Sequence, residues 1–302
     1  MKRKGLLLAI ILITMNLLLQ VVAEGRERLL TDETGRKVKV PPSPRRIVSL
    51  APNVTEILFS LGLDEEIAGV TDFCDYPEAA SKKPRIGGYI NPSLEKIVSV
   101  KPDLIFGIKE AIRMEAVQAL ADLGFPVYVV DPGGFDGVMK TIENIGEVVG
   151  RRNESVKIVK GMTAGKERLV SLTRSLSRPR VYFQLGAGSM VTVGRGSLAD
   201  DLIRLAGGTN ISGEESMSYP LYSIETILSK APEIIIVSSM EGKKDYSNVV
   251  EKWQQFKSIP AVRRKAIHVI DSNLVDRATP RIIEGLEILV RIIHPEALER
   301  KR

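Results

Sequence analysis

The sequence predicts an α/β protein with two lobes, each built on a parallel sheet, and a single long helix between them. Three observations support this prediction. Residues 24–302 exceed the usual size of a single hydrophobic core. Segments with the patterns of strands and helices alternate along the chain, which is the order expected for parallel sheets. Finally, part of the first half recurs in the second half at a fixed offset.

The repeat is a helix–turn–strand unit. Residues 93–105, SLEKIVSVKPDLI, recur as residues 223–235, SIETILSKAPEII, at an offset of 130 positions without a gap. We expect Ser93 and Ser223 to cap the two helices, and Glu95 and Glu225 to lie in their first turns, where the helix dipole favours negative charge. Any helix–turn–strand unit has some likeness to another, so the local match alone is open to that simpler explanation.

Two further pairs of segments match in the same order, and a duplicated lobe explains all three matches together. The pairs are Arg46–Leu50 with Arg180–Gln184, and Val127–Asp131 with His268–Asp271.

The remaining patterns give the order of the elements. Pattern and turn residues predict a hairpin over 29–40, a strand over 46–50, a loop over 51–53, a helix from Thr55 that Gly62 ends, and a helix over 135–149. Apolar spacing over 154–176 predicts a helix of about 35 Å between the lobes. Gly161 and Gly165 each disfavour this helix by about 1 kcal/mol relative to alanine. The expected domains are therefore residues 1–23, 24–153, 154–176 and 177–302.

Residues 1–23 have the basic, apolar and small regions of a secretory signal peptide. A retained N-terminal anchor is the alternative, although the apolar run is marginal for spanning a membrane. No cysteine lies near the end of this segment, which excludes a lipidated N-terminal cysteine. Removing the segment lowers the formal charge from +6 to +3, too little and too dispersed to suggest a nucleic-acid surface.

Composition also argues against metal and covalent chemistry. Cys74 is the only cysteine, so the chain forms no internal disulfide. We interpret Cys74 as a small buried residue, and the alternatives are a reactive thiol or a ligand to a chelated metal. His268 and His294 are the only histidines, which leaves no His/Cys cluster and predicts neither a metal site nor a cofactor. The chain has no Gly-x-Ser-x-Gly motif, and the glycines of residues 186–188 lack the third glycine of a dinucleotide loop. We therefore expect a binding protein, with an extracytoplasmic α/β enzyme as the alternative.

Loops that follow strands are the expected binding surface, because ligands of open α/β sheets lie outside the carboxyl ends of the strands. Aromatic residues are scarce in this chain, and several of them fall in these loops. Rings placed there favour stacking against a ligand, while local packing is the alternative for any single ring. The candidate ligand-binding residues are Asn53, Phe73, Tyr89, Tyr219, Tyr222, Asp276 and Arg277. Asp276 and Arg277 are also adjacent enough to form a simple local ion pair.

From Arg46 to Arg281, the chain resembles the periplasmic binding proteins of cobalamin and iron-siderophore ABC importers, the class with a helical backbone between its lobes. The most specific pieces are Asp75–Pro77, Leu94–Leu104 and Asp276–Arg281, and they are most similar to the vitamin B12-binding branch. The resemblance implies two Rossmann-like lobes, a ligand cleft between them, and an ABC permease dimer as the membrane partner. It also implies that Glu95 and Glu225 dock on that permease.

In cobalamin binders, aromatic residues at the positions of Phe73, Tyr89 and Tyr219 hold the corrin, together with an acidic residue at the position of Asp276. This sequence departs from the family by having tyrosines where tryptophans are common and Ile108 where another aromatic often stands. The expected ligand is therefore a corrinoid, with a ferric siderophore or haem as the alternatives. The resemblance places the chain outside the cytoplasm, as a monomer that is free or held by its N-terminal segment.

Overall fold

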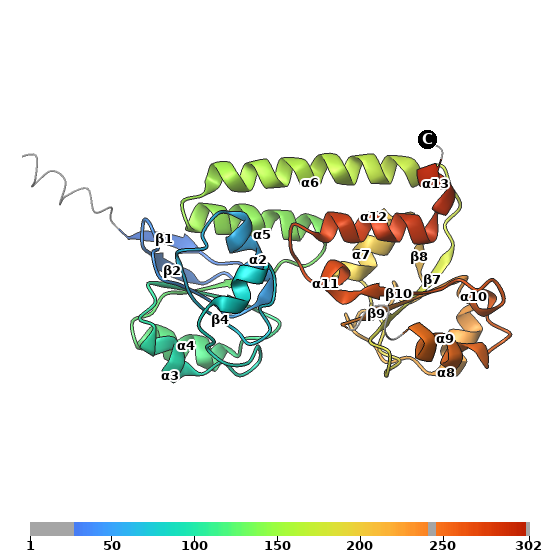
Figure 1. The fold of residues 1–302 in the computed structure, drawn as a ribbon, viewed down its shortest axis with the longest axis horizontal. Coiled ribbons are helices and arrows are strands. Elements are labelled where there is room, and N and C mark those ends of the chain that lie inside the picture. Colours follow the sequence, from blue (N-terminus) through green and yellow to red (C-terminus); the bar gives the residue numbers. More distant parts are fainter. Residues whose placement is uncertain (1–26, 241–245, 300–302) are drawn as a thin grey trace, which may run out of the picture. The chain divides into compact units, whose positions relative to one another are not determined.

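The computed structural model describes residues 27–240 and 246–299, and the expected signal or anchor segment lies outside them. The chain forms two compact units, and each unit is built from several separate stretches of the sequence (Figure 1). The first unit contains the described residues up to Ala51, then Leu63–Val130 and Glu147–Arg151. The second unit contains Pro52–Gly62, Asp131–Gly146 and the described chain from Arg152 onward. Within the described part of the chain, no helix has the length and hydropathy needed to cross a bilayer.

The first unit is built on a four-stranded parallel sheet with the order β4-β3-β5-β6. Its strands are β3 (Ile47–Ser49), β4 (Ile67–Val70), β5 (Leu104–Ile108) and β6 (Val127–Val130). The expected hairpin is confirmed as β1 (Arg28–Thr31) and β2 (Lys37–Val40), which pair antiparallel. Helices α3 (Leu94–Ser99) and α4 (Met114–Asp122) pack on the sheet through a core that includes Val48, Ile97, Ile105 and Leu120, and a 3-10 helix spans Glu78–Lys82.

The second unit has its own four-stranded parallel sheet, with the order β10-β9-β7-β8. Its strands are β7 (Arg180–Leu185), β8 (Thr209–Asn210), β9 (Ile234–Ser239) and β10 (Ile267–Asp271). Its helices are α2 (Pro52–Ser60), most of α5 (Phe135–Val148), α6 (Arg152–Thr173), α7 (Leu198–Leu205), α8 (Ile224–Lys230), α9 (Tyr246–Gln254), α10 (Pro260–Arg263), α11 (Ser272–Val275), α12 (Ile282–Ile293) and α13 (Pro295–Glu299). In Figure 1, α8, α9 and α10 lie on one side of this sheet, and α7 and α12 lie on the other.

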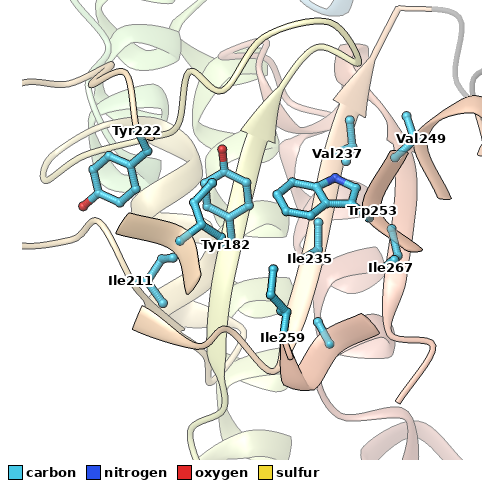
Figure 2. Packing of buried hydrophobic residues seen from close by; sticks show 11 residues of the cluster. Tyr182, Ile211, Tyr222, Ile235, Val237, Val249, Trp253, Ile259 and Ile267 are labelled. Carbon is cyan, nitrogen blue, oxygen red and sulfur yellow. The ribbon is translucent and has the colours of Figure 1, made fainter. Parts of the chain in front are cut away.

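The core on the α8–α10 side contains the single tryptophan of the chain. Tyr182 and Trp253 meet edge to face, with their ring centroids 5.7 Å apart. The indole nitrogen of Trp253 donates a hydrogen bond of 3.1 Å to the side-chain carbonyl of Gln184. Figure 2 shows these rings together with Tyr222 and Ile235, so strands β7 and β9 share this core with the helices.

The two sheets confirm the duplication that the repeat predicts. Each has the same strand order in sequence terms, since β3, β4, β5 and β6 correspond to β7, β8, β9 and β10. The register is equivalent as well, because Ile47 pairs with Leu104 in the first sheet and Val181 pairs with Ile234 in the second. Matching registers at matching repeat positions follow from two copies of one α/β unit.

Both helices of the repeat begin as expected. The hydroxyl of Ser93 accepts a hydrogen bond of 3.3 Å from the backbone nitrogen of Lys96, and Ser223 accepts one of 3.2 Å from Thr226. These contacts confirm the two N-caps. After the helices, Lys101 and Ala231 occupy the same position of the repeat and share a left-handed conformation with φ of 46°. A conformation that costs energy in non-glycine residues is thus kept in both copies.

An arginine before each first strand holds this turn in place. In the first unit, the carboxylate of Asp103 accepts the backbone N–H of Arg46 at 2.9 Å, and the Arg46 side chain donates to the carbonyl of Lys101 at 3.2 Å. In the second unit, Glu233 accepts the backbone N–H of Arg180 at 3.1 Å, and Arg180 donates to the carbonyl of Ala231 at 3.0 Å. Arg46 and Arg180, which match in the sequence, therefore stabilise the same turn in the two units.

Some element bounds differ from the predictions. Helix α2 begins at Pro52 rather than near Thr55, so the predicted loop over 51–53 is wrong for its last two residues. Proline is well suited to the first helical turn, because the N–H that it lacks would have no partner within the helix there. Helix α6 begins and ends earlier than predicted. Gly165 within α6 is explained by packing, because a Cβ there would lie 2.8 Å from Ile283 of α12.

A buried ion-pair cluster joins α2 to the late part of the chain. The carboxylate of Glu56 lies 3.1 Å from Arg277 and 2.9 Å from Arg281, and its side chain is 2% exposed. Both arginine side chains are largely buried too. Removing one partner of such a cluster leaves uncompensated buried charge, which is more costly than losing a surface pair.

We therefore expect Glu56→Ala to lower the free energy of unfolding by about 3 kcal/mol or more. Glu287→Ala is the matched control, because Glu287 pairs with Arg168 at the surface and its loss should cost about 1 kcal/mol or less. Urea unfolding of both variants measures the difference. Equal losses would contradict the importance of the buried cluster.

Candidate functional site

The loop after β4 presents Phe73 on a fixed backbone. The guanidinium of Arg85 donates to the carbonyls of Thr71 at 2.6 Å and Cys74 at 3.0 Å. Cys74 is 1% exposed and its sulfur lies 3.2 Å from the Thr71 hydroxyl, the environment of a small buried residue. Phe73 between them is 52% exposed. The loop is thus anchored from within while it holds an aromatic ring in solvent.

A second loop, 87–92, lies beside the first and carries Tyr89. The backbone nitrogen of Asp72 donates to the carbonyl of Gly87 at 2.9 Å, which connects the two loops. Gly87 has φ of +105°, and a Cβ there would lie 2.9 Å from the backbone nitrogen of Ser93, so this position requires glycine. Burial and the negative charge of Glu110 raise the pKa of Tyr89 to about 12. The Tyr89 hydroxyl therefore keeps its proton at neutral pH and is available as a donor.

The corresponding loop of the second unit is residues 217–222. It lies along residues 190–194 beyond the end of β7, where Thr192 donates to the carbonyl of Pro220 at 2.9 Å. Gly194 allows this approach, since a Cβ there would collide with the carbonyl oxygen of Met217 at 2.0 Å. Tyr219 is 46% exposed on this loop, as its predicted role requires.

Exposed aliphatic residues accompany the aromatic ones, and the sequence analysis missed them. Ile90 is 59% exposed beside Tyr89, and Met217 and Leu221 are 65% and 73% exposed on either side of Tyr219. Clustered apolar exposure of this kind is typical of binding surfaces. The neighbouring tyrosines are the one sequence signal that could have pointed to them, because an isolated isoleucine or leucine is expected in the core.

Tyr222 does not stand away from the core as expected. Its side chain is 7% exposed and belongs to the hydrophobic cluster of Tyr182 and Trp253 (Figure 2). Its hydroxyl donates to a carboxylate oxygen of Glu215 at 3.0 Å. Burial and this negatively charged partner raise the pKa of Tyr222 to about 12. The expectation of a free loop ring is wrong here, because the segment turns inward one residue before the cap Ser223.

Asp276 and Arg277 follow α11, beyond the carboxyl end of β10. Asp276 is exposed to solvent. Desolvation of its carboxyl group raises the pKa of Asp276 to about 6. The negative charge of Asp271 also raises this pKa, whereas a hydrogen bond with Ser238 lowers it. Arg277 instead pairs with Glu56 at 3.1 Å, so its guanidinium contributes to the buried cluster that holds α2.

Asn53 lies in the first turn of α2 and is 6% exposed. Within the described chain, its side-chain nitrogen has no hydrogen-bond partner. A buried donor that is left unsatisfied costs about 1–3 kcal/mol, and such groups are uncommon in native proteins. The side-chain amide of Asn53 is therefore a buried donor without an acceptor in the described chain.

Glu95 and Glu225 occupy equivalent positions in the first turns of α3 and α8, and both are exposed. Hydrogen bonds from its own backbone and from Ser223 lower the pKa of Glu225. In the described residues, no group of three or more His, Cys, Asp or Glu side chains is arranged to hold a metal ion.

The comparisons with known proteins agree with this architecture. Residues 47–274 match the model of a periplasmic binding protein family. The substrate-binding lipoprotein YvrC of an ABC transporter from Bacillus subtilis is 28% identical over 275 residues, which cover 89% of this chain and 86% of YvrC.

Two solved structures are similar. The vitamin B12-binding protein BtuF of Vibrio cholerae has a TM-score of 0.75 and 26% identity, covering 84% of this chain and 98% of BtuF. The haem-binding protein RhuT of Roseiflexus sp. RS-1 has a TM-score of 0.74 and 25% identity, covering 84% of this chain and 99% of RhuT.

The family match covers most of the chain, so this protein belongs to the periplasmic binding proteins. It is a solute-binding protein of the ABC-transporter type and not an enzyme, which excludes the alternative of an extracytoplasmic α/β enzyme. Within that class, it belongs with the binding proteins for vitamin B12, haem and iron-siderophore ligands, whose partners are a small molecule and a membrane permease.

The raised pKa of Asp276 gives a pH-dependent stability. The folded state binds a proton more tightly than the unfolded state, whose value is near 3.8, so the folded protein loses stability as pH rises from about 4 to about 6. Asp276→Asn removes the charge, and we expect it to be more stable than the wild type at pH 7 and equal to it at pH 3.5. Thermal unfolding across this range measures the difference, with Asp122→Asn as an exposed control. A constant difference at all pH values would contradict the assignment.

Proposed function

We propose that this protein captures a corrinoid, a cobalamin-like ligand, outside the cytoplasm and delivers it to an ABC permease. The observation that carries the proposal is the exposed apolar surface of the loops beyond the sheets, which includes Phe73 and Ile90 in the first unit and Tyr219 and Leu221 in the second. Side chains of this kind gain most from contact with a large, flat, apolar ligand. The similarity to vitamin B12-binding proteins supports the same choice.

Polar groups of the loops suit the rim of a corrinoid. A corrin ring carries amide side chains, which offer both N–H donors and carbonyl acceptors. The protonated Tyr89 hydroxyl would donate to such a carbonyl. The carboxylate of Asp276 would accept an amide N–H. Each of these donors or acceptors pairs with a neutral amide and needs no charged partner on the ligand.

Haem is the second candidate, and the similarity to RhuT favours it. Haem offers the same flat apolar surface but carries two carboxylates in place of amides. A carboxylate of haem would meet the like charge of Asp276, which is unfavourable. A ferric siderophore is the third candidate. The exposed apolar surface suits a corrinoid and haem equally. We prefer the corrinoid because its neutral amides suit the polar groups of the loops better than the carboxylates of haem do.

Isothermal titration of the protein with cobalamin, cobinamide, haem and ferric siderophores tests the choice. We expect micromolar or tighter binding of a corrinoid, with the two corrinoids bound more tightly than haem. Absence of micromolar binding to either corrinoid would contradict the proposal, and tight binding of haem alone would replace it with the second candidate.

Ring removal on the loops tests the site. We expect Phe73→Ala and Tyr219→Ala each to weaken the affinity for the preferred ligand by about tenfold or more, which corresponds to about 1.4 kcal/mol. Leu123→Ala is the control, because Leu123 is also exposed, at 61%, and lies at the C-terminal cap of α4. Titration calorimetry measures the three affinities, and an equal effect in the control would place the binding surface elsewhere.

We also propose that Glu95 and Glu225 dock on the permease. They are exposed carboxylates at equivalent positions of the two copies, the arrangement that a twofold-symmetric partner requires. Interface charges that steer a partner contribute little to the folding of the free protein, so their reversal should leave the rest of the molecule unchanged.

The double variant Glu95→Lys/Glu225→Lys should abolish ligand uptake through the cognate permease in vesicles and leave ligand affinity intact. The double variant Glu115→Lys/Glu251→Lys makes the same charge change at other exposed positions, one in each unit, and should transport normally. Normal transport by the first variant would refute the docking assignment.

The N-terminal segment completes the proposal. Residues 1–23 direct export, and the mature protein acts as a monomer, either released or held at the membrane surface by that segment. The mass of the protein recovered from the producing cell distinguishes the two forms, because cleavage removes the first 23 residues.

A further inference from the structure

A cavity lies in the second unit, and its lining is distinct from the residues proposed for ligand binding. Its volume is about 650 Å³, within the range of small-molecule sites. It opens beside the short edge strand β8, which pairs with β7 through two residues. Its lining includes five basic residues, and these are Arg178, Arg180, Arg195, Arg204 and Lys230. None of the residues proposed for the corrinoid or the permease lines it.

Neutral groups hold several of these arginines in place. The guanidinium of Arg178 donates to the carbonyls of Arg204 at 3.0 Å and Gly208 at 2.8 Å. The guanidinium of Arg195 donates to the carbonyls of Gly213 at 3.3 Å and Glu214 at 3.2 Å. A backbone carbonyl orients a guanidinium without cancelling its charge. The remaining N–H groups of the fork stay available to an oxyanion.

The charges around the cavity do not balance. Asp200 and Glu214 are the acidic residues of the lining, against five basic ones. Asp200 is engaged internally, because it accepts a hydrogen bond of 2.8 Å from the Asn210 side chain. Arg180 and Arg204 have acidic partners, Glu233 and Asp201. Within residues 27–240 and 246–299, neither Arg178 nor Arg195 takes part in an ion pair, so the lining keeps an excess of positive charge.

The duplication shows that the fold does not require this charge. Arg180 corresponds to Arg46 and keeps the same contact with the turn, so it is structural in both copies. By the same alignments, Arg178 corresponds to Pro44 and Lys230 corresponds to Val100. The first copy therefore forms the same sheet without cations at these two positions.

We propose that this cavity binds a multivalent oxyanion, a molecule with two or more phosphate or carboxylate groups. Guanidinium forks bind both groups in a bidentate manner, and several converging cations favour an anion with more than one charged group over a single one. The site is independent of the corrinoid-binding loops, so its occupation and the proposed transport function can fail separately.

Titration calorimetry of the full chain with tripolyphosphate, citrate and orthophosphate tests the proposal. We expect saturable binding of tripolyphosphate or citrate at one site, and the tighter of the two identifies phosphate or carboxylate as the natural group. Orthophosphate should bind at least about tenfold more weakly, because it engages fewer cations. No saturable binding of either multivalent anion, or equal binding of orthophosphate, would overturn the proposal.

Variants locate the site. Arg178→Gln/Arg195→Gln should weaken binding of the preferred anion by about tenfold or more. Arg152→Gln/Arg174→Gln removes the same charge from exposed positions outside the cavity and should change affinity by less than about twofold. Equal losses in the two variants would mean general charge attraction and would overturn the assignment. Corrinoid affinity should be unchanged in both.

If the melting temperature shows that Arg178→Gln/Arg195→Gln does not fold, Lys230→Gln decides the question. The Lys230 ammonium lies 5.9 Å from the centre of the Tyr222 ring. We expect this variant to weaken anion binding by about threefold or more. Unchanged affinity would exclude the cavity as the site.

Discussion

Each unit depends on one contact between an arginine and the turn that precedes an inner strand. Arg46 and Arg180 donate to the carbonyls of Lys101 and Ala231, whose left-handed conformation is unfavourable without such support. The turn sets where the inner strand enters the sheet and where the preceding short helix ends. The exposed glutamate of that helix is then fixed relative to the sheet. A cap, a strained turn and a surface charge thus form one structural unit that occurs twice.

The binding loops combine anchored backbones with exposed apolar side chains. Arg85 holds the loop of Phe73 through two carbonyls, and Gly194 lets the loop of Tyr219 lie against residues 190–194. Exposed rings on a loosely held loop would collapse onto the protein surface. Here the backbone bonds keep the rings apart from the core, so their burial is left for a partner molecule. A prepared surface of this kind lowers the entropic cost of binding.

The sequence was sufficient for the fold because the repeat preserved polar as well as apolar positions. Ser93, Ser223 and the arginines before β3 and β7 could be matched by position, and the structure gives each of them the same contacts. The sites were less predictable, since exposure depends on tertiary packing. Tyr219 and Tyr222 are three positions apart in one segment, yet Tyr222 is in the core and Tyr219 is exposed to solvent.

The partners of Glu56 could not be predicted at all. Its ion pairs with Arg277 and Arg281 join positions 221 and 225 residues apart, and no local pattern records such a contact. Sequence reasoning placed Arg277 in the ligand site because it stands, with Asp276, in a late loop that follows a strand. The structure shows instead how the two could cooperate, since an arginine held by Glu56 fixes the backbone from which the Asp276 side chain extends.

The same cluster has a consequence for the synthesis of the chain. Helix α2 is made early, yet it belongs to the unit whose last segments are made at the end. Until Arg277 and Arg281 have been added, the Glu56 carboxylate lacks both of these ion-pair partners. The first sheet, whose strands all lie before residue 131, is free to form long before this. Maturation of the protein is therefore staged, with one lobe able to form early and the other completed only after nearly the whole chain has been produced.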